Sequence, residues 1–314
     1  DNVAIGYSAC GAANGSGQLV AVGGYALADV TTGNRNTALG YYAGKTITTG
    51  DDNIAIGAHS LDTNTTGGYN IAIGSHALGK SNGGQNVAIG YYALEENTTG
   101  DDCVAVGSEA LTNNTTASYN VAVGKQALYT NTTGHSNTAV GWKALYTNAT
   151  TSWNTAFGTQ AAETYAGNEI DAFGFQALKA CTTGIRNAAF GAYTLDACTT
   201  GVYNNAFGYA ALSAVTTGRD NCAFGSNALL VNTADNNTAM GYLSGAANTT
   251  GSGNAFYGSA SGAACTTGDS NTAIGRDALR LNTTGAGSVA VGRDALSANT
   301  TASNNTAVGV EALA

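Results

Sequence analysis

A short motif of the form Asn-x-Ala-(Val/Ile/Phe)-Gly recurs from one end of the 314-residue chain to the other. Its glycine occurs nineteen times; fifteen of the eighteen intervals between successive glycines are 17 residues long and three are 16. A unit this short cannot hold a helix pair or a propeller blade, which need about 34 residues or more. Because the motif recurs at nearly constant spacing along the whole chain, there is no room for a linker between domains. We therefore expect residues 1–314 to form a single repeat array, a segment of a longer fibre.

Each copy reads, in consensus, Asn-Thr-Ala-Val-Gly-x-x-Ala-Leu-x-x-Asn-Thr-Thr-Gly-x-x, as in residues 137–153. Many β-branched residues between recurrent glycines are typical of short strands joined by turns. We predict an all-β fold, a parallel β-solenoid (β-roll) of nineteen coils of about 17 residues, with two strands of about four to five residues in each coil. Coils about 4.8 Å apart would stack into a rod on the order of 90 Å long.

The composition agrees with this fold and excludes several partners. The chain has no proline, as expected where nearly every backbone N–H takes part in a hydrogen-bond ladder. Its net charge of -9 argues against nucleic acid or anionic lipid as the main partner. No apolar run approaches the roughly 18 residues of a membrane span, so we expect no membrane insertion.

The strand of the motif is apolar on both faces, as in Val121-Ala122-Val123. Alanine stands two residues before the motif glycine in eighteen of nineteen copies, Phe256 being the exception, and suits the narrow inside of a coil. The other face needs a cover that one thin coil cannot supply, which predicts self-association into a homo-oligomer. Five consecutive coils carry Phe before the glycine, and we expect these rings to form a structural ladder in a core or an interface: Phe157, Phe173, Phe190, Phe207 and Phe224.

The asparagine of the Asn-Thr-Thr-Gly segment predicts a buried corner. Its position also accepts Cys, Val and Ile, and successive Asn side chains could stack amide on amide. Cys181 and Cys198 lie one repeat apart at this corner. A disulfide could just span them, but small buried thiols are the favoured interpretation.

No catalytic constellation or cofactor motif is present, so we expect a protein that is not an enzyme and needs no cofactor. His59 and His76 hold the same position in neighbouring coils and could lie about 5 Å apart. Two nitrogens fall short of a zinc site, which favours stacked surface imidazoles and no metal. The acidic pairs Asp51-Asp52 and Asp101-Asp102 lie three coils apart, too far to share one ion.

Aromatic residues recur at the two positions after the motif glycine, and we expect them on the surface. Such rings could contact another subunit or a receptor such as a cell-surface glycan. The candidate contact residues are Tyr41, Tyr42, Tyr91, Tyr92, Trp142, Phe175, Tyr209 and Tyr242.

The string Asn-x-Ala-(Val/Ile)-Gly-x-x-(Ala/Ser), as in Asn53–Gly57 with Ser60 and Asn271–Gly275 with Ala278, resembles the head repeats of trimeric autotransporter adhesins of the YadA-like type. Units ending in Asn-Thr-Thr-Gly, as at 97–100, resemble repeats of phage tail-fibre proteins and of bacterial surface proteins with tail-fibre-type domains. The resemblance implies a left-handed roll, a homotrimer, and an extracellular, cell-surface or virion location. The period of 17 is longer than is typical of the adhesin heads.

These features predict a non-enzymatic structural and adhesive rod, the shaft or head of a phage tail fibre or bacterial surface adhesin that mediates attachment. One alternative is a filament that assembles end to end, because the array begins inside a repeat and ends without a capping segment. Another is an ice-binding solenoid, because paired threonines follow the motif glycine by eight and nine residues in thirteen coils. Adjacent strand residues point to opposite faces, so we expect only one outward threonine in each coil.

Overall fold

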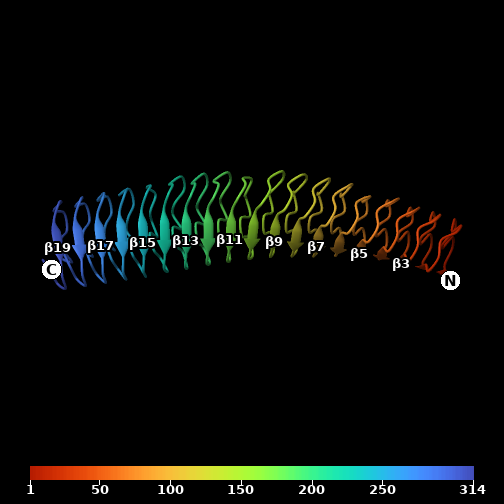
Figure 1. Ribbon diagram of the computed structural model, residues 1–314, viewed down its shortest axis with the longest axis horizontal. Helices are drawn as coiled ribbons and strands as arrows, with labels where there is room; N and C mark the ends of the chain where they lie inside the picture. Colours follow the sequence, from red (N-terminus) through yellow and green to blue (C-terminus); the bar gives the residue numbers. More distant parts are fainter. The chain divides into compact units, whose positions relative to one another are not determined.

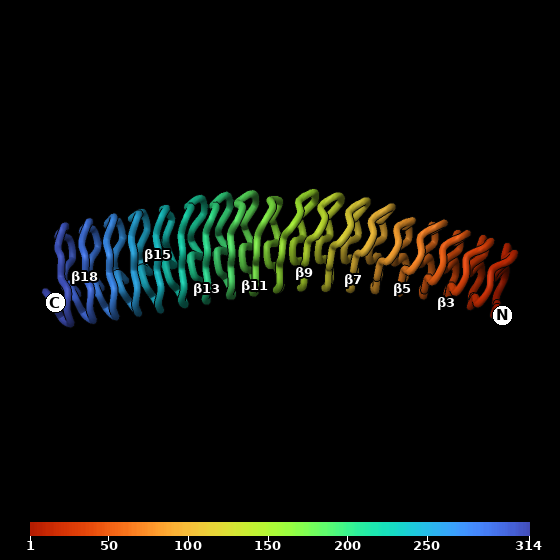
Figure 2. Tube along the Cα trace, viewed as in Figure 1, coloured from red at the N-terminus to blue at the C-terminus, as the bar shows by residue number.

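The computed structural model describes residues 1–314 and confirms the predicted parallel β-solenoid (Figure 1). It contains no helix that could span a bilayer. The chain divides into two compact units, Asp1–Thr155 (unit 1) and Ala156–Ala314 (unit 2), and the Cα trace shows the same coil repeated within each (Figure 2). The strands are β1 (Val3–Ile5), β2 (Val20–Val22), β3 (Thr37–Leu39), β4 (Ile54–Ile56), β5 (Ile71–Ile73), β6 (Val87–Ile89), β7 (Val104–Val106), β8 (Val121–Val123), β9 (Thr138–Val140), β10 (Thr155–Phe157), β11 (Asp171–Phe173), β12 (Ala188–Phe190), β13 (Asn205–Phe207), β14 (Cys222–Phe224), β15 (Thr238–Met240), β16 (Ala255–Tyr257), β17 (Thr272–Ile274), β18 (Val289–Val291) and β19 (Thr306–Val308).

Each coil has one strand of three residues, so the expectation of two longer strands is wrong. The chain after the strand is a series of tight turns: Ala43 N–H donates to the Gly40 carbonyl (3.3 Å), and Ile47 N–H donates to the Gly44 carbonyl (3.2 Å). Backbone φ is positive at Tyr42 and Gly44, the third residues of the turns that Ala43 N–H and Lys45 N–H close, as turns of type II require. These alternating positive φ angles prevent a second strand from forming.

Strands pair in parallel and in register within each unit, as where Ala105 pairs with Ala122. Coils of 16 residues keep the register: Ile71 of β5 pairs with Val87 of β6, and Cys222 of β14 pairs with Thr238 of β15. Alignment with the longer coils places the missing residue at the second threonine of the corner, outside the strand. Backbone N–H groups of the turns also donate to the next coil, as from Leu128 to the Ala144 carbonyl (3.0 Å), which agrees with the absence of proline.

The interior of each coil is filled by small and branched side chains together with two columns of asparagine. The alanine in the middle of the strand is buried, as predicted, and so is the corner position. The predicted amide ladder is confirmed there: Asn114 Nδ2 donates to Asn97 Oδ1 (3.0 Å), and Asn131 Nδ2 donates to Asn114 Oδ1 (2.9 Å). These amides thus satisfy one another inside the buried corner.

The asparagine of the motif itself forms a second buried ladder, which was not predicted from the sequence. Asn53 is fully buried: its backbone N–H donates to Asn36 Oδ1 (2.9 Å), and its Nδ2 donates to the Gly67 carbonyl across the coil (3.0 Å). Each of these side chains therefore ties two neighbouring coils and two corners of one coil together. The feature of the sequence that could have predicted this ladder is the recurrence of asparagine four residues before the motif glycine.

Phe256 takes the place of the inner alanine in β16 and is fully buried. Gly245 and Gly262 stand in the coil positions that carry leucine in fourteen other copies. A Cβ at Gly245 would lie 2.7 Å from the Phe256 ring, and one at Gly262 would lie 2.4 Å from it. The two glycines therefore make room for one large ring.

Candidate functional site

The outer strand face of unit 1, formed by the first and third residues of β1–β9, carries only aliphatic residues and threonine. The alanine between them points inward, so both flanking side chains point out. Nothing within the chain covers several of them. The exposed members are Val3, Ile5, Val20, Leu39, Ile54 and Ile89.

The phenylalanine ladder lies on the corresponding outer face of unit 2, in strands β10–β14. Its rings stack with centroids 5.2, 4.7, 4.6 and 4.3 Å apart and planes within 11°. Phe157 and Phe224 at its ends are 39% and 38% exposed. The interior behind these rings belongs to alanines such as Ala189. The rings therefore lie outside the interior of the coil, so the expectation of a core position is wrong, and their role in an interface stays a prediction.

A second ring stack runs over five consecutive coils of unit 1, at the position two after the motif glycine. Successive centroids lie 4.9, 5.2, 5.1 and 4.9 Å apart, and successive planes are within 27°. The stacked imidazoles predicted for His59 and His76 are confirmed, at 5.1 Å. Their continuity with tyrosines on both sides was missed, although the shared position in the repeat could have revealed it. The ring stack consists of Tyr25, Tyr42, His59, His76 and Tyr92.

Two platform tyrosines, Tyr41 and Tyr91, lie across this stack. Tyr41 is inclined by 74° to Tyr42 (4.3 Å) and by 83° to His59 (5.7 Å), and Tyr91 is inclined by 74° to Tyr92 (4.1 Å). Because the stacked rings cover each other's faces, a perpendicular ring packs against their edges and keeps one face free. The platforms are 52% and 51% exposed.

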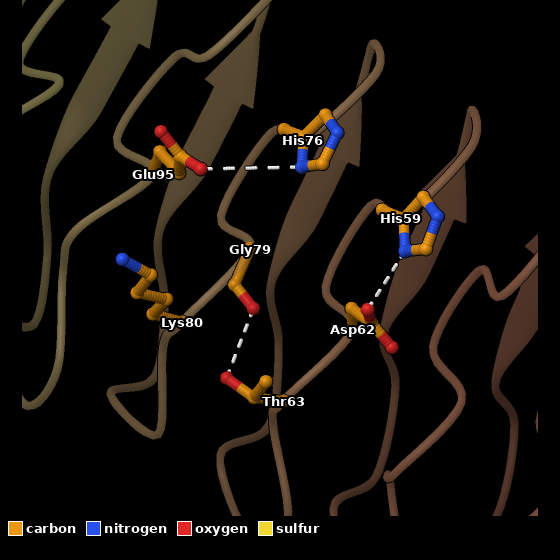
Figure 3. Close-up of a pocket in the computed structure, with 7 residues that line it drawn as sticks. All are labelled: His59, Asp62, Thr63, His76, Gly79, Lys80 and Glu95. Carbon is orange, nitrogen blue, oxygen red and sulfur yellow. Dashed lines mark hydrogen bonds and ion pairs between the residues drawn. The ribbon is translucent and has the colours of Figure 1, made fainter.

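A pocket of about 240 Å³ lies beside the imidazoles of the ring stack (Figure 3). His59 Nδ1 lies 2.9 Å from Asp62 Oδ2, and His76 Nδ1 lies 3.9 Å from Glu95 Oε1. Burial raises the pKa of Glu95 above its usual value. The pocket is lined by His59, Asp62, Thr63, His76, Gly79, Lys80 and Glu95.

This pocket offers hydrogen-bond donors and acceptors. The structure contains no group of three or more His, Cys, Asp or Glu side chains placed to hold a metal ion. The acidic corner residues have structural partners: Asp52 pairs with Arg35 (2.7 Å), whose hydrogen bond lowers the pKa of the Asp52 carboxyl, and Asp101 Oδ1 accepts from Gly84 N–H (2.7 Å).

The other predicted contact residues are also on the surface, in separate groups. Phe175 and Tyr209 both meet Tyr193 edge-on, at 5.3 and 5.8 Å. Trp142 lies under the Lys143 ammonium (5.2 Å), and Tyr242 is exposed. The eight predicted residues therefore do not form one row; four of them, Tyr41, Tyr42, Tyr91 and Tyr92, belong to the ring cluster of unit 1.

The paired threonines differ from expectation. Thr115 is half-buried and Thr116 is exposed, so both side chains of a pair reach the surface. The expectation of one outward threonine is wrong because this segment is a bend, where strand alternation does not apply. The Thr115 hydroxyl donates to the Thr132 carbonyl of the next coil (3.0 Å), and equivalent bonds recur along both units.

Cys181 and Cys198 are free thiols in the buried corner, as the favoured interpretation predicted. The Cys181 thiol donates to the Gly184 carbonyl (3.6 Å), in the same way as the asparagine amides of other coils. Cysteine therefore substitutes for asparagine as a small corner donor.

No protein-family model matches this chain, and no curated protein is similar enough to count as a relative. A functional proposal therefore depends on the surfaces described above.

Proposed function

We propose that this chain is a non-enzymatic structural and adhesive protein that associates with copies of itself. It serves as the shaft or head of a phage tail fibre or a bacterial surface adhesin, outside the cell or on a virion, and mediates attachment. The observation that carries the proposal is the outer strand face of unit 1, with its exposed aliphatic residues repeated coil after coil.

The periodicity of this face supports a second copy as its partner. Ordered apolar surface without any charge is unusual on a monomer and marks an interaction site. A partner that fits over many coils needs side chains at the same spacing, about 4.8 Å along the axis. Another copy of the chain has that spacing, and closed symmetric assemblies are the common form of homo-oligomers. The family resemblance favours a homotrimer.

The test is the absolute mass in solution by light scattering across a hundredfold range of concentration. We expect a constant threefold multiple of 31.2 kDa. The double variant Ile54→Asp/Ile89→Asp places two charges on the outer strand face and should reduce the mass to that of a monomer, with an unchanged circular dichroism spectrum. The matched control Thr116→Asp/Thr133→Asp adds the same charge on exposed bends and should remain trimeric.

Two results would count against the proposal. A wild-type mass of 31.2 kDa at every concentration would show that the chain does not self-associate. An Ile54→Asp/Ile89→Asp variant that keeps the full oligomer mass would show that the outer strand face is not the interface.

Ice binding is a second candidate, which the accessibility of both threonines in each pair favours. The hydroxyl bond from the first threonine to the next coil fixes that side chain in a regular row. Thermal hysteresis that Thr116→Lys/Thr133→Lys abolishes would support this function. Hysteresis equal to that of buffer would refute it.

A further inference from the structure

We infer that the ring cluster of unit 1 between Tyr41 and Tyr91 binds a neutral polysaccharide chain. The inference names a ligand class for the attachment role proposed above and rests on that role for its biological purpose. Its geometric basis is separate, because the cluster does not use the outer strand face.

The first argument is the free face of each platform tyrosine. Tyr41 and Tyr91 are half exposed and lie across the edges of the rings beneath them, so each presents a flat aromatic surface to solvent. The C–H face of a pyranose ring packs on such a surface while its hydroxyls stay hydrated. Tyrosine supplies this contact together with a polar tip.

The second argument is the spacing of the two platforms. They hold the same position three coils apart, which is about 14 Å at about 4.8 Å per coil. Ala58 and Ser75 hold this position in the coils between them. Small side chains there leave a stretch, as long as a short oligosaccharide, in which the chain can run from one platform to the other.

The third argument is the hydrogen-bonding capacity along that stretch. Nδ1 of each imidazole faces a carboxylate, and Figure 3 shows the other ring nitrogen pointing away from it. That nitrogen can bond a sugar hydroxyl, since imidazole accepts or donates according to its protonation. His59 and His76 also line the pocket, where Lys80 adds a donor and the Thr63 hydroxyl, which donates to the Gly79 carbonyl (2.9 Å), can still accept. The two imidazoles are therefore the residues that the ring cluster and the pocket share.

The charge of the cluster selects neutral chains over anionic ones. Asp62, Glu95 and Glu96 outnumber Lys80 and Lys45, whose ammonium lies 4.8 Å from the centroid of the Tyr42 ring. Lys80 is paired with Glu96 at 2.5 Å. The whole chain has a net charge of -9. A sulfated or uronic acid-rich polysaccharide would be repelled.

The local extent of the cluster argues against a second copy as its partner. After Tyr91-Tyr92 the same two positions hold Ser108-Glu109 and then Lys125-Gln126. A self-associating face repeats in every coil, as the outer strand face of unit 1 does, whereas this ring stack spans five coils and ends at Tyr92. A discrete patch fits a discrete ligand.

The experiment is native affinity electrophoresis in gels containing dextran, galactomannan or hydroxyethyl cellulose, with heparin as the anionic comparison. We expect at least one neutral polysaccharide to retard the wild-type chain and heparin to leave it unretarded. The double variant Tyr41→Ala/Tyr91→Ala should bind at least tenfold more weakly. Tyr242→Ala removes an equally exposed tyrosine from the equivalent position in unit 2 and should bind as the wild type does.

Failure of this inference and failure of the proposed assembly give different results. Retardation by none of the neutral polysaccharides, retardation by heparin alone, or equal retardation of the double variant would overturn the glycan site. Loss of the oligomer mass in Tyr41→Ala/Tyr91→Ala would assign the rings to a second copy and would also overturn it. If the wild type is a monomer and its retardation depends on the two tyrosines, the glycan site is supported and only the proposed self-association is refuted.

Discussion

Replacing Phe256 with alanine should open a cavity inside unit 2. The ring is fully buried, and its two axial neighbours are glycines whose Cβ positions would lie within 2.4 and 2.7 Å of it. Removing a buried phenylalanine usually costs about 3–5 kcal/mol, and the cost depends on how far the neighbours can relax into the space. Gly245 and Gly262 have no side chains to move, so we expect a value near the upper end, about 4–5 kcal/mol.

The consensus coil offers a built-in rescue. The triple variant Phe256→Ala/Gly245→Leu/Gly262→Leu restores the alanine and the two leucines found at these positions in most coils. Burying two leucines contributes about 3–6 kcal/mol in total. Their positive φ angles oppose this by about 1–2 kcal/mol each. On the midpoints of these ranges, about 4.5 kcal/mol gained against about 3 kcal/mol lost, the triple variant should recover about 1.5 kcal/mol relative to Phe256→Ala.

The assay is urea unfolding followed by circular dichroism, with the midpoint and slope compared among variants. Because coils stack in one dimension, a local change can separate the transitions of neighbouring segments, and the slope would report this. Gly262→Leu alone is the complementary variant and should destabilise the wild-type background through contact with the ring. The reasoning is refuted if the triple variant is no more stable than Phe256→Ala, or if Gly262→Leu is neutral.

Three further changes test the interior and the corners. Asn64 is buried without a hydrogen-bond partner for its side chain, so Asn64→Val should stabilise the chain by about 1 kcal/mol in urea unfolding. Asn114→Val removes three side-chain hydrogen bonds, to Asn97, Asn131 and the Ala117 carbonyl, and should cost about 1–3 kcal/mol. Gly107→Ala places a Cβ 2.7 Å from the Gly124 carbonyl of the next coil, at a φ of 133°. It should lower the free energy of unfolding by at least about 2 kcal/mol. In the control Gly17→Ala the new Cβ has no neighbour closer than 3.9 Å, so this variant should be neutral by the same measurement. Burial raises the pKa of Cys103 from 9.0 to about 11, so the folded state favours the neutral thiol. This contribution to stability is complete below pH 9 and is lost as the pH rises through 11. Cys103→Ala should therefore flatten the pH dependence of the free energy of urea unfolding in that range by up to about 3 kcal/mol.

The period of the motif predicted the fold because it fixes register. Equivalent residues must stack when strands one repeat apart pair in parallel, and this places Ala105 beside Ala122 without further information. The number of strands in a coil could not be predicted in the same way. Leu128 has a φ of 51°, a conformation that leucine rarely adopts, so its propensity argues against the turn that it makes. Its side chain is fully buried, and packing inside the coil outweighs the backbone cost.

The candidate site was only partly predictable for a similar reason. The repeat assigns His59 and His76 to one column, and their stacking follows from the coil spacing. The perpendicular setting of Tyr41 does not follow, since side-chain torsions depend on which edges and faces the neighbours leave open. The pocket beside the imidazoles depends on Asp62 and Glu95, which come from the turns after two different strands.

The surface proposed for assembly and the surface proposed for ligand binding differ in how constant their positions are along the repeat. The inner positions of a coil this narrow are taken by alanine, leucine and asparagine, so variation is confined to outward positions. Those of β1–β9 stay aliphatic or threonine from coil to coil, as an interface between periodic bodies requires. Those after the motif glycine change from Tyr41 to Ala58, Ser75 and Tyr91 within three coils. A column free to vary in this way can acquire a local ligand site without altering the fold beneath it, because the turns depend on the glycine and on the buried leucine.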